Sequence, residues 1–501
     1  MRSLNLLFGV MTLTFTGTLL AAAAGCESVT SLSLPHTTIL SAMAVPAGQF
    51  VPPVARGQAA NVFTKLPAFC RVTASLKPAK DSDIGIEVWL PSAGWNGKLQ
   101  SVGNGAWAGT ISYPALATAV MAGYAAASTD TGHTGNNPDF VPGHPEKLAD
   151  FIHRSVHEMT IAAKSIISEF YGNAPKYSYW NGCSTGGRQA LTEAQRYPND
   201  YDGIIAGAPA AYMTRLQGMQ VWASWQANRN AASLIPESKF SMLHNAVLAA
   251  CDGLDGVRDG VIEDPAKCKF DPQVVACKNG DAPNCLTSEQ VETARNMYAG
   301  PRKNGKNIYP GIEPGSEMGF NMIGGAKVMS LAEELYKYAA FGLSKDDHWD
   351  MKNFKLEDIE RFEKEKGKVM DSFDPNLNAF FGHNGKLLMY HGWGDPGVPP
   401  QGTVNYFKLV NKTVGPKAQD DMRLFMVPGM GHCRGGDGTD DFDMIKAMEQ
   451  WVEKGNAPSS IPASRLREGK VDRTRPLCAY PMKAVYKGSG STDNAANFSC
   501  Q

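Results

Sequence analysis

The sequence lacks a strong net charge and any cluster of basic residues. Its 48 Lys and Arg residues are balanced by 49 Asp and Glu residues, which gives a formal net charge of −1. Proteins that bind nucleic acids or other polyanions usually concentrate positive charge on one face, so no nucleic-acid partner is expected. The mixed charges at 357–368 are typical of a solvated helix face.

Long hydrophobic runs are also absent, except at the N-terminus. There Arg2 is followed by an apolar run at 4–20 and by the alanines 21–24. This order of charge, apolar core and small residues is typical of a secretory signal, so residues 1–24 are expected to be removed. No later segment has the roughly 20 apolar residues that span a bilayer, so the mature chain is expected to be secreted or periplasmic, with no membrane span.

Cysteine is scarce, but the ten cysteines are an even number. In an exported protein this favours five disulfides, with Cys26 as one partner. The pair Gly25-Cys26 also allows the alternative of lipid attachment at Cys26. Against that alternative, Ala23 stands three positions before the cysteine, where a branched aliphatic residue is usual.

Short, strand-like apolar runs alternate with helical segments such as 158–170, which predicts an α/β domain with buried parallel strands. Between about 211 and 380 the sequence pattern changes. This segment has helical stretches that contain Met, Trp and Asn, and it also has Asp-Gly turns and a cluster of cysteines. We therefore expect a discontinuous α/β domain at 25–210 and 381–501, with 211–380 inserted as a lid over one end of the sheet. The strand-like runs lie at 84–90, 99–102, 177–180, 203–206, 386–390 and 424–427.

Gly182-Cys183-Ser184-Thr185-Gly186 matches the G-x-S-x-G nucleophile elbow. The motif alone is common, but here a strand-like run precedes it and a predicted helix at 188–197 follows it, closed by Pro198. The two glycines let the turn close tightly and expose Ser184, and the helix N-terminus favours developing negative charge. Ser184 is therefore the candidate nucleophile, which needs a base and an acid to orient that base.

Asp395 and His432 are the candidate acid and base. Each follows a strand-like run, and they come in the chain order, acid and then histidine, that α/β hydrolases use after the serine. Taken singly, Asp395 is typical of a turn and His432 of an ordinary histidine. His391 competes as the base, but it precedes Asp395, and a structural hydrogen bond in its glycine-rich turn is predicted instead.

The oxyanion hole is expected to take one backbone N–H from Thr185, the residue after the nucleophile. A second N–H is expected from Gly105 or Ala106, in the glycine-rich segment Gly103-Asn104-Gly105-Ala106-Trp107 that follows a strand-like run. An ordinary loop is the alternative interpretation of that segment.

Two cysteines border the candidate triad, since Cys183 precedes Ser184 and Cys433 follows His432. With this pattern the chain resembles the tannase and feruloyl esterase family of secreted serine esterases. The likeness covers most of the mature chain and is carried by 181–188, 201–209, 390–395, 427–433, 473–478 and 486–490. It implies an α/β-hydrolase fold with a lid and a triad of Ser184, Asp395 and His432. It also implies the pairs Cys183–Cys433, Cys26–Cys70, Cys251–Cys268, Cys277–Cys285 and Cys478–Cys500, which spacing alone does not choose.

The family also carries a structural calcium site in the lid. The sequence matches it at Asp252, Asp255 and Asp259, with backbone oxygens from Val257 and Val261. Three carboxylates so close together repel unless they turn outward or share a hard cation such as Ca²⁺. A set of Asp-Gly turns is the alternative interpretation. No organic cofactor is expected.

The resemblance implies hydrolysis of aromatic-acid esters through an acyl-enzyme, with feruloyl (hydroxycinnamoyl) or galloyl esters as leading substrates, free or attached to plant polysaccharide or polyphenol. A terephthalate monoester hydrolase belongs to the same family, so a synthetic aromatic ester is an alternative. Acyl transfer or peptide cleavage would use the same triad. A non-catalytic, calcium-stabilised binding protein is a further rival, against which the complete set of Ser184, Asp395 and His432 argues.

Overall fold

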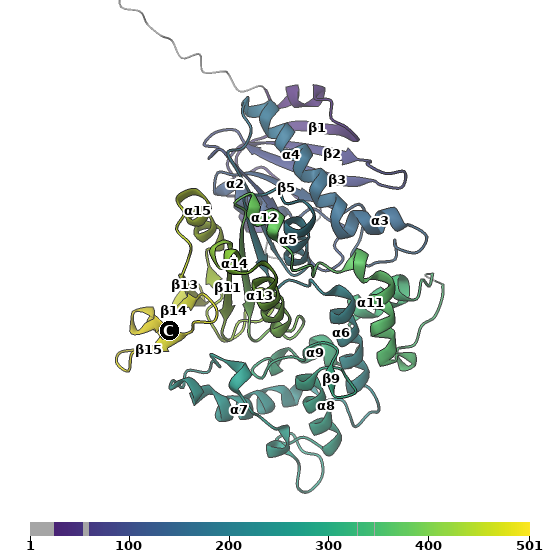
Figure 1. The fold of residues 1–501 in the computed structure, drawn as a ribbon, viewed down its shortest axis with the longest axis vertical. Coiled ribbons are helices and arrows are strands. Elements are labelled where there is room, and N and C mark those ends of the chain that lie inside the picture. The colour runs from purple at the N-terminus through teal and green to yellow at the C-terminus, as the bar shows by residue number, and fades with distance from the viewer. Residues whose placement is uncertain (1–24, 54–59, 328, 345) are drawn as a thin grey trace, which may run out of the picture.

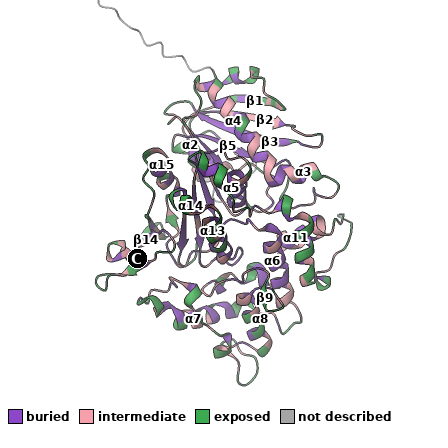
Figure 2. Cartoon of the chain, viewed as in Figure 1, coloured by how far each residue is buried: buried purple, intermediate pink, exposed green. Residues whose placement is uncertain are grey.

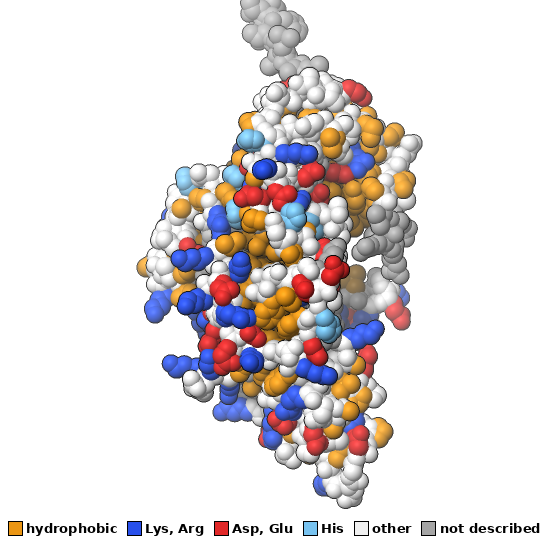
Figure 3. Space-filling view, turned by 90° about the vertical axis from the view of Figure 1, so that its right-hand side faces the viewer, with side chains coloured by type: hydrophobic (Ala, Val, Ile, Leu, Met, Phe, Trp, Pro, Cys, Tyr) orange, Lys and Arg blue, Asp and Glu red, His pale blue; other side chains and the backbone are white. Residues whose placement is uncertain are grey.

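The computed structural model describes residues 25–501 apart from 54–59, 328 and 345. The predicted secretory signal at 1–24 lies outside the described residues. Among the residues that are described, no helix is long and apolar enough to cross a membrane. Acidic and basic side chains are interspersed on the face drawn in Figure 3, in keeping with the near-zero net charge.

A nine-stranded sheet forms the centre of the molecule, in the order β1-β2-β3-β5-β4-β6-β7-β10-β11 (Figure 1). The first three strands run antiparallel to their neighbours, and β5 to β11 run parallel. The carboxyl ends of the parallel strands therefore meet at one edge, where loops can combine functional groups. The strands are β1 Thr37–Val45, β2 Phe69–Leu76, β3 Ile84–Pro91, β4 Lys98–Val102, β5 Ala125–Thr129, β6 Tyr177–Cys183, β7 Gly203–Gly207, β10 Lys386–Gly392 and β11 Met422–Val427.

Helices cover both faces of this sheet, which leaves its strands buried (Figures 1 and 2). Side chains alternate between the faces, so Leu387 and Met389 of β10 lie in one core and Leu388 lies in the other. The first core is covered by α4 Ser155–Tyr171, α5 Thr185–Arg196, α12 Asn378–Gly382, α13 Pro400–Val414 and α14 Pro416–Asp421. The second is covered by α1 Ala60–Phe63, α2 Tyr113–Met121 and α15 Met444–Lys454. The α/β class expected from the sequence is confirmed.

The segment between β7 and β10 is largely helical and lies beyond one end of the sheet (Figure 1). It has a core of its own, which Trp107 and Phe151 of the α/β domain join. The expected boundary at residue 380 falls inside α12, whose Phe380 and Phe381 already pack in the core of the sheet. The main helices of the inserted segment are α6 Met213–Ala227, α7 Phe240–Cys251, α8 Ser288–Ala299, α9 Asn321–Gly324, α10 Ser330–Leu335 and α11 Leu356–Met370.

Five disulfides form, and they are the five pairs that the resemblance implies. The bond between Cys26 and Cys70 fixes the helical turn Cys26–Ser31 to β2. It also uses the sulfur atom to which a lipid would be attached, so the alternative of lipid attachment at Cys26 is wrong. The last disulfide joins β14, Lys470–Cys478, to β16, Phe498–Cys500, at the C-terminal end of the chain.

Candidate active site

Ser184 occupies a sharp turn between β6 and α5. Its φ of 64° lies in the left-handed region, which non-glycine residues rarely adopt, and the turn is held by its N–H, which donates to the carbonyl of Gly207 over 3.0 Å. The neighbouring glycines are required by space: a Cβ on Gly182 would lie 2.6 Å from the carbonyl oxygen of Gly186. This is the strand, turn and helix that the elbow motif predicts.

The structure brings the three predicted triad residues together. Nε2 of His432 lies 2.9 Å from Oγ of Ser184, and Nδ1 of His432 lies 2.6 Å from Oδ2 of Asp395. The serine follows β6, the acid follows β10 and the histidine follows β11, so all three lie at the carboxyl ends of parallel strands. A serine hydroxyl, an imidazole and a carboxylate in this sequence of hydrogen bonds can activate the hydroxyl as a nucleophile.

Asp395 is completely buried, and its carboxylate is fully hydrogen-bonded. Its Oδ1 accepts from the N–H groups of Gly397 and Val398 over 2.8 and 2.9 Å. Its Oδ2 also lies 3.1 Å from Nε2 of His391. Burial opposes the charged form, but His432 and His391 together hold the pKa of Asp395 well below its ordinary value. The carboxylate therefore stays ionised beside the imidazole of His432.

His391 has the structural hydrogen bonds that its glycine-rich turn predicts. Its Nε2–H donates to the carbonyl of Val398 over 2.9 Å and faces Asp395, and its Nδ1 bonds the hydroxyl of Thr403 over 2.7 Å. Because both ring nitrogens are engaged and the ring is fully buried, His391 is not placed to act as the base for Ser184.

The pKa of His432 gives a prediction for the pH dependence of activity. Burial disfavours the imidazolium, but the charge and the hydrogen bond of Asp395 outweigh it and raise the pKa above the ordinary value of 6.5. A protonated imidazole cannot accept the proton of Ser184, so kcat/KM should fall as the pH drops through this raised pKa. In a pH–rate profile with a neutral ester, we expect the midpoint of the acid limb above 6.5; a midpoint below 6.5 would contradict this assignment.

The predicted oxyanion residues line the same cavity as Ser184. Thr185 is the first residue of α5, so its backbone N–H has no acceptor one turn earlier in the helix. Its hydroxyl donates to the carbonyl of Ala106 over 2.7 Å, which fixes the Gly105-Ala106 segment beside the nucleophile. Ala106 has a φ of 50°, a conformation that this tether helps to hold. Backbone N–H groups of Thr185 and of Gly105 or Ala106 are therefore available to stabilise an oxyanion.

A second tether to α5 holds this segment through Asn104. The backbone N–H of Asn104 donates to Oε1 of Gln189 over 3.0 Å, while Nε2 of Gln189 donates to Oδ1 of Asn104 over 3.0 Å. The carbonyl of Asn104 accepts from the N–H of Gly186 over 2.8 Å. The helix that carries the nucleophile thus also positions the predicted oxyanion loop.

The disulfide between Cys183 and Cys433 joins the neighbours of the nucleophile and the base. The two Cα atoms are 6.1 Å apart, and the bond links positions separated by 250 residues. Cys433 has a φ of 64°, so both Ser184 and Cys433 adopt left-handed conformations at the site. The bond ties the end of β6 to the loop after β11, and with them Ser184 to His432.

A cavity of about 410 Å³ opens at Ser184 and His432. Apolar side chains from both the α/β domain and the inserted segment form most of its wall: Trp107, Met213, Leu216, Met322, Leu331 and Val398. Trp107 is held in place by stacking on Phe151, with ring centroids 4.4 Å apart. A flat, apolar acyl group fits such a wall better than a charged or highly hydrated group does.

The sequence of the chain is similar to proteins whose family is known. The family model described as "Tannase and feruloyl esterase" matches residues 70–501. The chain belongs to this family. It is 38% identical to an uncharacterised esterase of Xanthomonas campestris, over 96% of this chain and 92% of the relative. It is 33% identical to a probable feruloyl esterase B-1 of Aspergillus flavus, over 86% of each chain.

Solved structures give the same assignment. The crystal structure of feruloyl esterase B from Aspergillus oryzae superposes with a TM-score of 0.88 at 29% identity, covering 95% of this chain and 99% of the other. Tannin acyl hydrolase from Aspergillus niger superposes with a TM-score of 0.80 at 22% identity, covering 96% and 95%, and supports the fold alone. The protein is thus a carboxylic ester hydrolase of the tannase and feruloyl esterase family, with the α/β-hydrolase fold.

The five residues of the predicted calcium site lie in one loop that the Cys251–Cys268 disulfide brackets. Each carboxylate accepts from backbone N–H groups of the loop: Asp252 from Asp259 and Gly260, Asp255 from Val257, and Asp259 from Val261. Over the described residues, no three His, Cys, Asp or Glu side chains converge as a ready metal cluster. The curled loop is therefore also compatible with the alternative of Asp-Gly turns.

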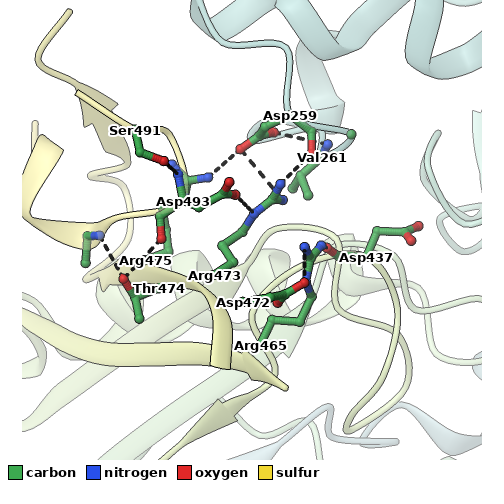
Figure 4. Close-up of polar contacts among 12 residues, drawn as sticks. Asp259, Val261, Asp437, Arg465, Asp472, Arg473, Thr474, Arg475, Ser491 and Asp493 are labelled. Carbon is green, nitrogen blue, oxygen red and sulfur yellow. Dashed lines mark hydrogen bonds and ion pairs between the residues drawn. The ribbon is translucent and has the colours of Figure 1, made fainter. Parts of the chain in front are cut away.

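Asp259 has a second role, which the sequence did not indicate. Its carboxylate is ion-paired with Arg475, lies 3.8 Å from Nη1 of Arg473, and its backbone carbonyl accepts from Arg473 over 2.9 Å (Figure 4). Arg473 also donates to Asp493 over 2.8 Å. These contacts attach the aspartate-rich loop to β14, which follows α15 in the chain.

The sequence did not reveal the polar residues of the cavity. Arg188 on α5 and Gln217 and Gln220 on α6 line it together with Ser184. A sequence signal existed: Met213, Leu216, Gln217 and Gln220 follow a helical spacing that puts two glutamines on an otherwise apolar face.

Proposed function

We propose that this protein is a secreted esterase that hydrolyses esters of aromatic acids through an acyl-enzyme. The observation that carries the proposal is the position of the Ser184–His432–Asp395 hydrogen-bond chain, at the mouth of a largely apolar cavity of about 410 Å³. A cavity of this size and lining suits one aromatic acyl group. The family description, tannase and feruloyl esterase, and the names of the feruloyl esterase relatives support the same class of substrate.

In the proposed mechanism, His432 takes the proton of Ser184 while Oγ attacks the ester carbonyl. Asp395 keeps the proton on Nδ1 and stabilises the imidazolium. The N–H groups of Thr185 and of Gly105 or Ala106 bind the oxyanion, and His432 then protonates the leaving alcohol. A water molecule activated by His432 cleaves the acyl-enzyme and releases the acid.

The proposed location is outside the cytoplasm. Five disulfides among the described residues are typical of a protein that folds in an oxidising compartment. The secretory signal predicted at 1–24 agrees with that location. Plant polysaccharides or polyphenols that carry aromatic acyl groups would be accessible to a secreted enzyme.

A panel of four esters tests the substrate class. We expect the purified protein to hydrolyse at least one of methyl ferulate, methyl caffeate and methyl gallate, with kcat/KM within the ordinary enzyme range of about 10⁴–10⁸ M⁻¹s⁻¹. A terephthalate monoester is the fourth member, and a clear preference for it would favour the synthetic-ester alternative. Transfer of the acyl group to an added alcohol, in place of release of the acid, would favour the acyltransferase alternative. Hydrolysis of simple aliphatic esters alone would contradict the proposal.

We also propose that Ca²⁺ binds the loop that contains Asp252, Asp255 and Asp259. The donor set consists of carboxylate and backbone oxygens, which Ca²⁺ prefers, with Val257 and Val261 as the backbone donors. Burial is the main cause that raises the pKa of Asp255, and the neighbouring carboxylates of Asp259 and Asp252 add to it. A divalent cation would offset this crowding of negative charge, and it would share the carboxylate of Asp259 with Arg475. Its role would be structural, since the loop is not part of the cavity wall at Ser184.

Removal of the metal gives the corresponding prediction. At a Ca²⁺ concentration 100 times its Kd, bound calcium would add about 2.7 kcal/mol to the free energy of unfolding, so chelation should lower the Tm by several degrees. The measurement is a thermal melt with EGTA and with added Ca²⁺. Asp255→Asn should abolish the difference, whereas Asp271→Asn, which removes an acid elsewhere in the inserted segment, should preserve it. Identical melts of the unmodified protein under both conditions would leave the Asp-Gly turns as the explanation.

A further inference from the structure

Within the part of the chain that the structure describes, three buried polar atoms without a hydrogen-bond partner belong to residues that line the cavity at Ser184. They are Nε of Arg188, Oε1 of Gln217 and Oε1 of Gln220. The three side chains are only 1%, 8% and 2% exposed, so bulk water does not easily replace the missing partners. Buried polar groups in native proteins are normally hydrogen-bonded, and an unpaired one is costly unless a ligand completes it.

Arg188 is fixed so that its Nε–H remains without a partner. Its Nη1 donates to the carbonyl of Ile152 over 2.7 Å and its Nη2 to that of Phe151 over 3.2 Å, while the guanidinium lies over the Phe151 ring. Of its three nitrogens, only Nε has no acceptor among the described residues. Among the described side chains, Arg188 forms no ion pair with an acid, and burial lowers its pKa to about 9.

Gln220 is fixed so that an acceptor remains free. Its Nε2 donates to the carbonyl of Gly397 over 2.7 Å. Because a carbonyl can only accept, the amide nitrogen must face Gly397, and Oε1 must be the atom left over. Gln217 lies three positions earlier on α6, on the same face of the helix, and its Oε1 is also unpaired.

We infer that Arg188, Gln217 and Gln220 form a polar subsite for a hydroxyl group on the ring of the aromatic acyl group. A hydroxyl group can accept from the Nε–H of Arg188 and donate to a glutamine oxygen, so it can complete both kinds of unpaired atom. A carboxylate can only accept, and its charge would face the oxygen of Gln220. An unsubstituted aromatic ring can pair with neither the Nε–H of Arg188 nor a glutamine oxygen. This inference rests on the proposed function and adds to it the residues that select a hydroxylated ring.

The test compares three esters that differ only at the far end of the ring: methyl 4-hydroxycinnamate, methyl 4-methoxycinnamate and methyl cinnamate. The methoxy group keeps the acceptor oxygen but has no proton to donate. A site built to bind a hydroxyl discriminates strongly against analogues that lack it. We expect kcat/KM of the unmodified protein to be at least about 100-fold higher for the hydroxy ester than for methyl cinnamate, with the methoxy ester well below the hydroxy ester.

Gln217→Leu is the diagnostic variant, because Gln217 holds no other part of the site. It should lower kcat/KM for the hydroxy ester by at least about tenfold and leave that for methyl cinnamate unchanged or higher. Gln226→Leu, on the same helix but outside the cavity lining, is the matched control and should leave the ratio unchanged. If the variant does not fold, inhibition of the unmodified protein by 4-hydroxycinnamate and by cinnamate gives a second measurement, with tighter binding expected for the hydroxy acid.

Two results would overturn the subsite alone: equal kcat/KM for the three esters in the unmodified protein, or equal losses on all three in Gln217→Leu. Methyl 4-carboxycinnamate is added as a fourth ester, and a preference for it over the 4-hydroxy ester would overturn the subsite in favour of an anion site at Arg188. No hydrolysis of these esters or of methyl ferulate, methyl caffeate and methyl gallate would instead overturn the proposed function, and the subsite with it.

Discussion

Replacing Ser184 by alanine is expected to lower kcat for ester hydrolysis by about 10⁴- to 10⁶-fold, with the fold unchanged. The hydroxyl is the atom that Nε2 of His432 contacts over 2.9 Å. Among the described residues that line the cavity, the hydroxyl of Thr185 is the one other nucleophilic group. The Thr185 hydroxyl already donates to Ala106 and has no base beside it. Loss of Ser184 therefore removes covalent catalysis and leaves only binding and the oxyanion donors.

The measurement is single-turnover hydrolysis of the best ester from the panel, together with labelling by a fluorophosphonate probe. Ser165→Ala, which removes a hydroxyl from α4 outside the cavity lining, is the control and should keep full activity and labelling. Labelling of Ser184→Ala at the normal rate would show that another residue is the nucleophile. An unmodified protein that cleaves no ester and takes no label would favour the non-catalytic rival.

Removing the disulfide at the site is expected to have the second-largest effect. In the chain-entropy model, a bond that joins positions 250 residues apart stabilises the folded state by about 5 kcal/mol, an upper value because other disulfides also restrict the unfolded chain. Cys183→Ala combined with Cys433→Ala should thus lower the free energy of unfolding by up to about 5 kcal/mol. It should also reduce kcat, by roughly 10- to 100-fold, because small displacements of Ser184 relative to His432 are costly to catalysis.

A matched pair separates the two effects. Cys277→Ala combined with Cys285→Ala removes a bond across 8 residues, worth about 2.5 kcal/mol in the same model, from a part of the inserted segment that does not line the cavity. That variant should lose stability and keep its kcat at a temperature where it is folded. If the two double variants lost kcat equally under such conditions, the bond at the site would be a stability element without a positional role.

The sequence predicted six of the nine strands of the central sheet and missed β1, β2 and β5. The first two of these are rich in branched and aromatic residues and could have been recognised. The six runs that the sequence indicated became β3, β4, β6, β7, β10 and β11. By contrast β5, Ala125–Thr129, begins with three alanines, and alanine favours helices over strands. Its strand form depends on pairing with β3 and β4, which no local pattern reveals.

In the candidate site, too, some residues could be predicted from the sequence and others could not. Ser184, Asp395 and His432 could be predicted because a tight turn and a fixed chain order leave a readable pattern. The polar end of the cavity could not, because glutamines on a helix are usually exposed, and only the packing of α6 against α11, α9 and α10 of the inserted segment buries Gln217 and Gln220. The loop at Asp252 lies between these cases, since its spacing matches a calcium site while its carboxylates are also satisfied by the loop's own backbone.

The bond between Cys183 and Cys433 also makes one closed covalent ring of residues 183–433, which contains the whole inserted segment. A protease that cut this ring once, anywhere between α6 and α11, would produce a fragment with Ser184 and a fragment with His432. The two fragments would stay joined beside the nucleophile and the base, at the place where their relative position matters most. A nicked molecule would therefore separate into halves only under reducing conditions.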